Sequence, residues 1–251
     1  VVEIPTDDTS SFKITPEQLK NALTPKTKIL VLTTPSNPTG SIYSKGELIK
    51  IAEVLEGTDI IVASDEMYEK LIYDGEFTSC AAINQDMFER TVTINGLSKS
   101  VAMTGWRFGY MAAHNTALIK ATKKLQSQST SNINSITQMA AIAGLNGSAD
   151  ADIEMMRKEF ASRRDEAVKL FNEIDGLSVL KPDGAFYLFV NIKEKSSDSL
   201  KFAKDLLAQK EVAVVPGVGF GSEGYFRFSF ATDIESIRTG IKRIEEFVKD
   251  L

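Results

Sequence analysis

The chain has 251 residues but only one cysteine, Cys80, and one histidine, His114. A single cysteine excludes an internal disulfide and is typical of a reducing compartment. A zinc or iron site needs several such side chains at short spacing, and His114 has no companion of that kind. The Walker A lysine motif and the Gly-x-Ser-x-Gly motif of serine hydrolases do not occur either. We therefore predict no metal site and no serine-hydrolase triad.

Strong charge asymmetry and long apolar runs are also missing. The net charge of −5 is spread along the chain without a basic tail or stripe, which argues against a nucleic-acid partner. No apolar run is long enough to cross a bilayer, and no signal peptide is present, so we predict a cytoplasmic protein without a membrane partner. The start, VVEIP at residues 1–5, lacks a methionine and resembles the end of a strand. We expect a processed or truncated product.

The composition, 43% hydrophobic and 25% charged residues, is ordinary for a globular protein with a sizeable core. Capping boxes at Thr15/Gln18 and Ser44/Glu47 predict helices over residues 16–22 and 45–55, the second burying Leu48, Ile49, Ala52 and Leu55. Apolar runs predict strands at residues 28–33, 59–64, 91–94 and 108–113. The run at 28–33 is typical of a strand covered on both faces. Alternating strands and helices indicate a wound α/β sheet.

The pattern changes near residue 150. An amphipathic helix is predicted over residues 151–174, with Ile153, Met156, Phe160, Ala167 and Phe171 near helical spacing. Further strands are predicted at 177–180, 185–192, 212–215 and 225–230, and further helices at 200–209 and 234–248. We therefore predict a mostly parallel α/β domain over residues 1–150 and an α+β domain over residues 151–251.

Lys99 is the leading candidate for chemistry. It lies among small and apolar residues directly after the predicted strand at 91–94. Burial disfavours the charged form of an amine, and an uncharged amine can attack a carbonyl. The chemistry most often built on such a lysine is a Schiff base with pyridoxal phosphate. The alternative is a solvated loop lysine.

Two further candidates follow predicted strands, at the edge where open α/β sheets bind ligands. Asn37 lies between two prolines in residues 34–40, a rigid turn that can include a cis bond, although an ordinary connection has the same composition. Asp65 could hold a pyridine nitrogen protonated, with Tyr68 donating to the ring's phenolate oxygen. Alternatively, Asp65 caps the next helix and Tyr68 packs on it.

Two arginines complete the candidate set. Arg107 could bind a phosphate through its planar fork, and the flanking glycines and Trp106 indicate tight packing rather than a surface salt bridge. Arg227 lies in an otherwise apolar strand, where an unpaired cation is costly. A substrate carboxylate or an internal acid could pair with it. The glycine-rich residues 216–221 lack the dinucleotide-binding spacing, and we interpret them as a flexible connection.

Taken together and in this order, these motifs resemble the fold-type I pyridoxal-phosphate aminotransferases, most closely the bacterial aspartate aminotransferases. The match spans nearly the whole chain. It consists of TPSNPTG at 34–40, SDEMY at 64–68, NGLSK at 95–99, MTGWRFGY at 103–110, QSQSTS at 126–131, GAFYLF at 184–189 and RFSFA at 227–231.

The resemblance implies specific roles. Lys99 would bond to the cofactor's aldehyde and then carry the proton that leaves the substrate Cα. Asp65 would hold the pyridinium nitrogen, while Tyr68 and Asn37 would hold the phenolate oxygen. Arg107 and Ser98 would bind the phosphate. Arg227, with the amide of Asn37, would bind the substrate α-carboxylate.

The resemblance also implies a fold and an activity. The fold would be an incomplete fold-type I large domain, a mostly parallel sheet wrapped by helices, with a C-terminal α+β small domain. The activity would be transamination in amino-acid metabolism and biosynthesis, between aspartate or a similar amino acid and 2-oxoglutarate. The full-length protein would be a homodimer that binds amino-acid and 2-oxo-acid substrates.

Two features depart from the family pattern. Many relatives have a serine three positions before the lysine, where this chain has Gly96, which removes one phosphate contact. The family's N-terminal portion, with a phosphate loop and a stacking aromatic ring, is absent, so we infer a fragment with little activity alone. The alternatives are a non-catalytic folded piece, an aromatic-preferring transaminase or a C–S lyase.

Overall fold

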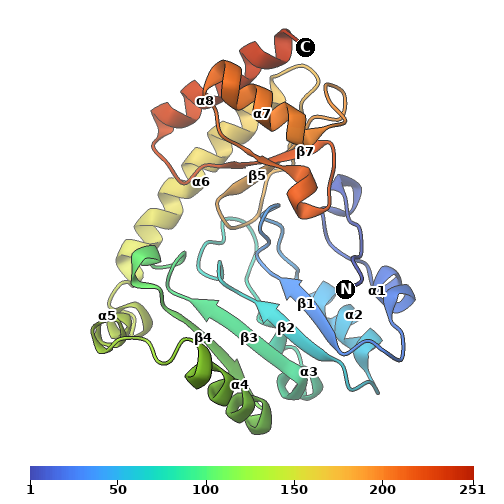
Figure 1. Ribbon diagram of the computed structural model, residues 1–251, viewed down its shortest axis with the longest axis vertical. Helices are drawn as coiled ribbons and strands as arrows, with labels where there is room; N and C mark the ends of the chain where they lie inside the picture. The colour runs from blue at the N-terminus through green and yellow to red at the C-terminus, as the bar shows by residue number, and fades with distance from the viewer.

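The computed structural model describes residues 1–251 and contains two sheets, each with its own helices (Figure 1). The larger sheet has the strand order β1-β2-β3-β4. β1, β2 and β3 are parallel, and β4 is antiparallel to β3. The strands are β1 Ile29–Thr33, β2 Ile61–Asp65, β3 Thr91–Gly96 and β4 Gly109–Ala113, each within about two residues of its prediction.

Three helices cover one face of this sheet: α1 Pro16–Ala22, α2 Lys45–Leu55 and α3 Gln85–Arg90. Both predicted capping boxes are present, at the start of α1 and of α2. In α2 the buried apolar side chains are Leu48, Ile51, Ala52 and Leu55, whereas Ile49 is 38% exposed. The prediction of Ile49 on the buried face was therefore wrong, because Ile51 fills that place.

The opposite face of β1 is open, which contradicts the prediction of a strand covered on both faces. Ile29 is 57% and Val31 69% exposed, while Leu30 and Leu32 are buried against the helices. An unbroken apolar run does not show which of its two faces has a partner. In this structure only one face of β1 packs against other residues.

Three helices had no counterpart in the predictions, α3 and, further along the chain, α4 Thr116–Ser129 and α5 Ser135–Leu145. The last two lie mostly open. α4 buries no residue, and α5 buries only Thr137, Ala141 and Gly144. Their apolar side chains therefore face outward, among them Leu125, Ile136, Met139 and Leu145. The motif at residues 126–131 lies at the end of α4.

The long helix α6, Asp150–Asn172, runs from the large sheet to the second sheet (Figure 1). The second sheet is antiparallel with the order β5-β7-β6 and packs on α6, α7 and α8 around an apolar core. Its strands are β5 Tyr187–Asn191, β6 Val215–Pro216 and β7 Tyr225–Ser229, and its outer helices are α7 Ser199–Lys210 and α8 Ile234–Lys249.

Three predictions fail in this part. Residues 177–180 form no strand, only an isolated bridge from Ser178 to Asn191. The strand predicted at 212–215 is two residues long and begins at Val215. Residues 217–220 form a 3-10 turn, with the backbone N–H of Val218 donating to Ser199 Oγ, rather than an irregular connection. In each case contacts with distant residues set the backbone conformation.

Two arginines of α6 bind the loop that follows β2 and the segment that precedes β5. Arg164 is buried and donates to Asp74 Oδ2 at 2.6 Å and to the carbonyl oxygen of Pro182 at 2.9 Å. Arg157 donates to the carbonyl oxygen of Ile72 at 3.1 Å. These contacts hold the two sheets together through one helix. The domain boundary near residue 150, where α6 begins, stays a prediction. None of the helices is long and apolar enough to cross a membrane.

Candidate functional site

The sheet register brings the three candidate loops to one edge. Thr33, the last residue of β1, is paired with Asp65, the last residue of β2, and Asp65 is paired with Ile94 of β3. Because the three strands are parallel, the loops that follow them begin side by side. These loops carry Asn37, Tyr68 and Lys99.

Asn37 meets Arg227 from the second sheet. Arg227 Nη1 donates to Asn37 Oδ1 at 2.7 Å, and its guanidinium carbon lies 4.4 Å from the ring centre of Tyr187 and 5.3 Å from that of Phe220. Asn37 is exposed and Arg227 is half-buried. No carboxylate forms an ion pair with Arg227, so the alternative of an internal acid partner is not realised. The guanidinium remains able to bind a carboxylate.

Tyr68 is buried and its hydroxyl lies 3.0 Å from that of Tyr187. Burial raises the pKa of Tyr68 well above its usual range, and the hydrogen bond to Tyr187 acts in the same direction. The phenol therefore stays protonated at neutral pH and remains a hydrogen-bond donor. That is the form needed to donate to a phenolate oxygen.

Asp65 is half-buried, and its Oδ1 accepts the backbone N–H of Met67 at 3.1 Å. This is the local capping contact of the alternative interpretation, and it uses only one of the two carboxylate oxygens. Ser100, next to Lys99, donates to the carbonyl oxygen of Met67 at 3.2 Å. The loop that carries Lys99 is thus tied directly to the turn after Asp65.

The next residue, Glu66, is fully buried below that turn. Its Oε1 accepts hydrogen bonds from Ser64 Oγ, Ser79 Oγ and the backbone N–H of Cys80, at 2.8, 2.9 and 3.2 Å. Burial raises the pKa of Glu66, and the hydrogen bonds offset part of this effect. This acid links the end of β2 to the loop at residues 79–80, so its carboxylate is bound by the protein's own donors.

Lys99 is half-buried, with its Nζ 5.7 Å from the ring centre of Phe186. It is neither a fully buried amine nor a free surface charge. The neighbouring Ser98 is also half-buried, and its carbonyl oxygen accepts a hydrogen bond from Thr104 Oγ1 at 2.9 Å. The lysine therefore lies near Phe186, the residue that precedes β5.

Arg107 is exposed, and the prediction of tight packing around it was wrong. Its Nη1 donates to the carbonyl oxygen of Thr104 at 2.9 Å, within its own loop. Trp106 is 44% exposed, and a Cβ on Gly105 would meet no atom within 4 Å. Arg107 lines an open hollow of about 710 Å³ with Asn132 and Asn134. Its free guanidinium edge faces solvent at this surface.

The residues of this edge fit pyridoxal phosphate in their chemistry. An amine, an acid, a phenol, an amide and a guanidinium are the groups needed for its aldehyde, ring nitrogen, ring oxygen and phosphate. Gly96 fits less well. A Cβ there would lie 2.7 Å from the carbonyl oxygen of Phe108, so a serine cannot replace it without a backbone shift. The backbone just before β4 therefore leaves no room for a side chain at this position.

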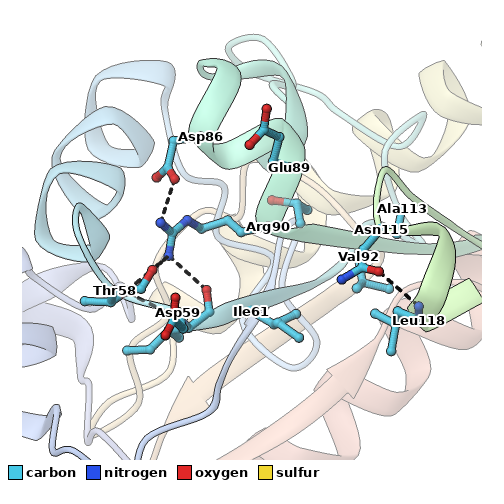
Figure 2. Close-up of a pocket in the computed structure, with 12 residues that line it drawn as sticks. Thr58, Asp59, Ile61, Asp86, Glu89, Arg90, Val92, Ala113, Asn115 and Leu118 are labelled. Atoms are coloured by element: carbon cyan, nitrogen blue, oxygen red, sulfur yellow. Dashed lines mark hydrogen bonds and ion pairs between the residues drawn. The ribbon is translucent and has the colours of Figure 1, made fainter.

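A second hollow, of about 350 Å³, lies at the opposite edge of the large sheet, where β2 and β3 begin (Figure 2). Arg90 spans it, donating to the carbonyl oxygens of Thr58 and Ile60 at 2.9 and 3.0 Å and to Asp86 at 2.6 Å. Both terminal nitrogens of its guanidinium are thus bound by the protein's own acceptors. None of the predicted site residues lines this hollow.

Sequence reasoning gave no role to Phe186 or Tyr187. In the structure Phe186 lies near Lys99, and Tyr187 lies between Tyr68 and Arg227. The motif at residues 184–189 contained the signal, two adjacent aromatic residues in a matched segment. Nothing local indicated that this strand packs over the loops of the other sheet.

Comparison with known proteins gives a consistent result. The model of the family "Aminotransferase class I and II" matches residues 1–244. The aspartate aminotransferase of Bacillus subtilis is 48% identical over 244 residues, which are 95% of this chain and 62% of that protein. The chain therefore spans less than two thirds of the length of this relative.

Solved structures of aminotransferases are also similar to this chain. The aspartate aminotransferase of Rhizobium meliloti superposes with a TM-score of 0.92 at 38% identity, covering 97% of this chain and 64% of that one. An aromatic aminotransferase from Pyrococcus horikoshii superposes with a TM-score of 0.92 at 40% identity, covering 99% and 67%. The name of the first protein indicates aspartate as its amino acid, and the name of the second indicates aromatic amino acids.

Proposed function

The chain belongs to the class I and II aminotransferases, and from this premise we propose that the protein transfers an amino group between aspartate, or a similar amino acid, and 2-oxoglutarate. Its cofactor would be pyridoxal phosphate, which when bound withdraws electrons from the substrate carbon that loses a proton. We further propose a homodimer that acts in the cytoplasm.

The observation that carries the proposal is the state of Arg227. A half-buried guanidinium without an acid partner is costly unless a ligand supplies the negative charge. It lies against Asn37, on the loop that begins next to Asp65. A carboxylate held by Arg227 would bring the rest of an amino acid toward the edge from which Lys99 extends.

Each side chain then has a task. Lys99 Nζ would hold the cofactor through its aldehyde carbon until the incoming amine releases it, and would then move the proton from the substrate Cα to the cofactor's C4′ carbon. Asp65 would hold the ring N–H through a charge-assisted hydrogen bond, and Tyr68 would donate to the ring oxygen. Arg107 and Ser98 would bind the phosphate.

The test is covalent trapping. The chain, and in parallel the whole gene product, is mixed with pyridoxal phosphate, reduced with borohydride, digested and analysed by mass spectrometry. We expect the adduct on the peptide that carries Lys99 and its loss in Lys99→Ala. The control Lys120→Ala removes an exposed lysine and should leave trapping unchanged. If no adduct forms on Lys99 in either protein, the proposal is wrong.

Donor preference is a separate question, because the two superposed structures carry different names, aspartate and aromatic aminotransferase. Arg227 would bind the α-carboxylate that all amino acids share, so it cannot distinguish donors. A panel of aspartate, asparagine, phenylalanine and cystathionine separates a dicarboxylate transaminase from an aromatic one and from a C–S lyase. Adduct formation without turnover of any donor would support a chain that binds the cofactor but does not catalyse the reaction alone.

A further inference from the structure

Tyr187 of β5 contacts residues that belong to two different parts of the proposed site. Its hydroxyl oxygen lies 3.0 Å from that of Tyr68, the proposed donor to the cofactor's ring oxygen. The face of its ring lies 4.4 Å from the guanidinium carbon of Arg227, the proposed carboxylate ligand. With 6% of its surface exposed, Tyr187 is almost inaccessible itself.

The small sheet fixes this position. In the antiparallel register Tyr187 is paired with Ser229, and Phe189 with Arg227, so Tyr187 and Arg227 are diagonal neighbours on one face. The rings of Phe186 and Tyr68 pack against Tyr187, with centroids 4.7 and 5.9 Å away. The ring therefore has little freedom to turn away from either partner.

The hydroxyl pair has a defined hydrogen-bond inventory. Each phenol has one proton to donate and can also accept. If Tyr68 donates its proton to a ligand oxygen, its contact with Tyr187 persists only when Tyr187 is the donor. A donor behind Tyr68 polarises its O–H bond and strengthens the hydrogen bond that Tyr68 makes. The ring of Tyr187 acts separately, because a cation over an aromatic face is attracted to it.

We propose that Tyr187 is a positioning residue of this site: its hydroxyl supports Tyr68 in binding the cofactor's ring oxygen, and its ring orients Arg227 toward the substrate carboxylate. The inference rests on the proposed function. The hydroxyl of Tyr187 would act on cofactor binding and its ring on carboxylate binding. Substitutions that remove only the hydroxyl, or the hydroxyl and the ring, therefore test the two roles separately.

The hydroxyl is tested with a double-mutant cycle of Tyr68→Phe and Tyr187→Phe, read from the dissociation constant of pyridoxal phosphate by absorbance titration. Loss of one neutral hydrogen bond corresponds to about a five-fold change. We expect Tyr187→Phe to weaken cofactor binding by about that factor when Tyr68 is present and by less than about two-fold when it is phenylalanine. A purely structural effect would be equal in both backgrounds.

The matched control is Tyr73→Phe, which removes another hydroxyl from the interior, one that donates to the carbonyl oxygen of Ala185. It should leave cofactor affinity unchanged. The ring is tested with Tyr187→Leu and an unreactive dicarboxylate, succinate, whose dissociation constant should rise about five-fold relative to Tyr187→Phe. Both variants lack the hydroxyl, so the difference reports the ring.

The outcomes are distinguishable. If wild-type protein forms the Lys99 adduct but Tyr187→Phe has the same effect in both backgrounds, or Tyr187→Leu binds succinate like Tyr187→Phe, the role of Tyr187 is refuted and the aminotransferase proposal stands. If wild-type protein forms no adduct, the proposed function fails and this inference fails with it.

Discussion

At the scale of single residues, two adjacent acids at the end of β2 have opposite surroundings. Asp65 is half-buried, whereas Glu66 is only 2% exposed. Glu66 accepts three hydrogen bonds but has no cationic partner. Its negative charge is therefore only partly compensated, and burial raises its pKa.

This shift predicts a pH-dependent stability difference. A carboxyl whose folded pKa is raised above its unfolded value holds its proton longer in the folded state, so its contribution to stability falls as pH rises through this window. For Glu66 the window begins near pH 4.5, the ordinary pKa of a glutamate side chain. Glu66→Gln keeps an acceptor oxygen but removes the titration.

The measurement is urea unfolding of wild type and Glu66→Gln between pH 4 and pH 8, on the scale set by ordinary carboxyl pKa values. We expect the variant to gain stability relative to wild type as pH increases. A stability difference that does not depend on pH would contradict the assignment. Glu69→Gln, a nearby acid that is less buried, serves as the control.

At the scale of elements, α6 joins the two sheets, and its Arg164 makes several buried contacts with residues outside the helix. The guanidinium is buried and contacts Asp74, Asp165, the carbonyl oxygen of Pro182 and the ring of Tyr73. Apart from Asp165, which lies on α6 itself, these partners lie on the loops that follow β2 and precede β5. Removal of the side chain would leave a buried carbonyl acceptor unpaired.

We therefore predict that Arg164→Ala lowers the free energy of unfolding by about 2–4 kcal/mol, in line with loss of a buried ion pair. The adjacent Arg163 forms an ion pair with Glu159 on the helix surface. Arg163→Ala should cost less than about 1 kcal/mol. Chemical denaturation of both variants provides the measurement. Equal losses of unfolding free energy would show that the buried Arg164 contributes no more to stability than the surface Arg163.

At the scale of the whole molecule, apolar side chains lie open on β1 and on α4 and α5. Val31 is 69%, Ile136 72% and Met139 69% exposed. β1 and β4 are the two edges of the sheet, and α4 contacts β4, so these are two separate apolar surfaces. A strand with an open edge and an apolar face, and an exposed apolar helix face, are each prone to associate with other chains.

We predict that the isolated chain self-associates in a concentration-dependent way and that Val31→Lys together with Met139→Lys reduces this. A lysine on an edge strand or on an exposed apolar face opposes association without burying a charge. Light scattering across a concentration series measures the association, and circular dichroism confirms that the fold is retained. Unchanged scattering in a folded double variant would exclude both surfaces as the cause.

The sequence determined the features that depend on residues close together along the chain. The capping boxes at Thr15 and Ser44 each close within four residues, so their hydrogen bonds form wherever the helix forms. The strands at the large sheet's core were predictable for a similar reason, because apolar runs between turn residues need no distant partner to be recognised. The seven candidate residues followed from motifs in these same segments, and their roles stay predictions.

Tertiary structure decided what depends on contacts between distant residues. Arg227 and Asn37 are 190 positions apart, and Tyr68 and Tyr187 are 119 apart. The packing of the small sheet over the loops of the large one decided whether Arg227 had an acidic partner. It also placed Tyr187 between Tyr68 and Arg227. The same reason explains the open face of β1 and the exposure of Arg107, because a side chain is buried only where another part of the chain covers it.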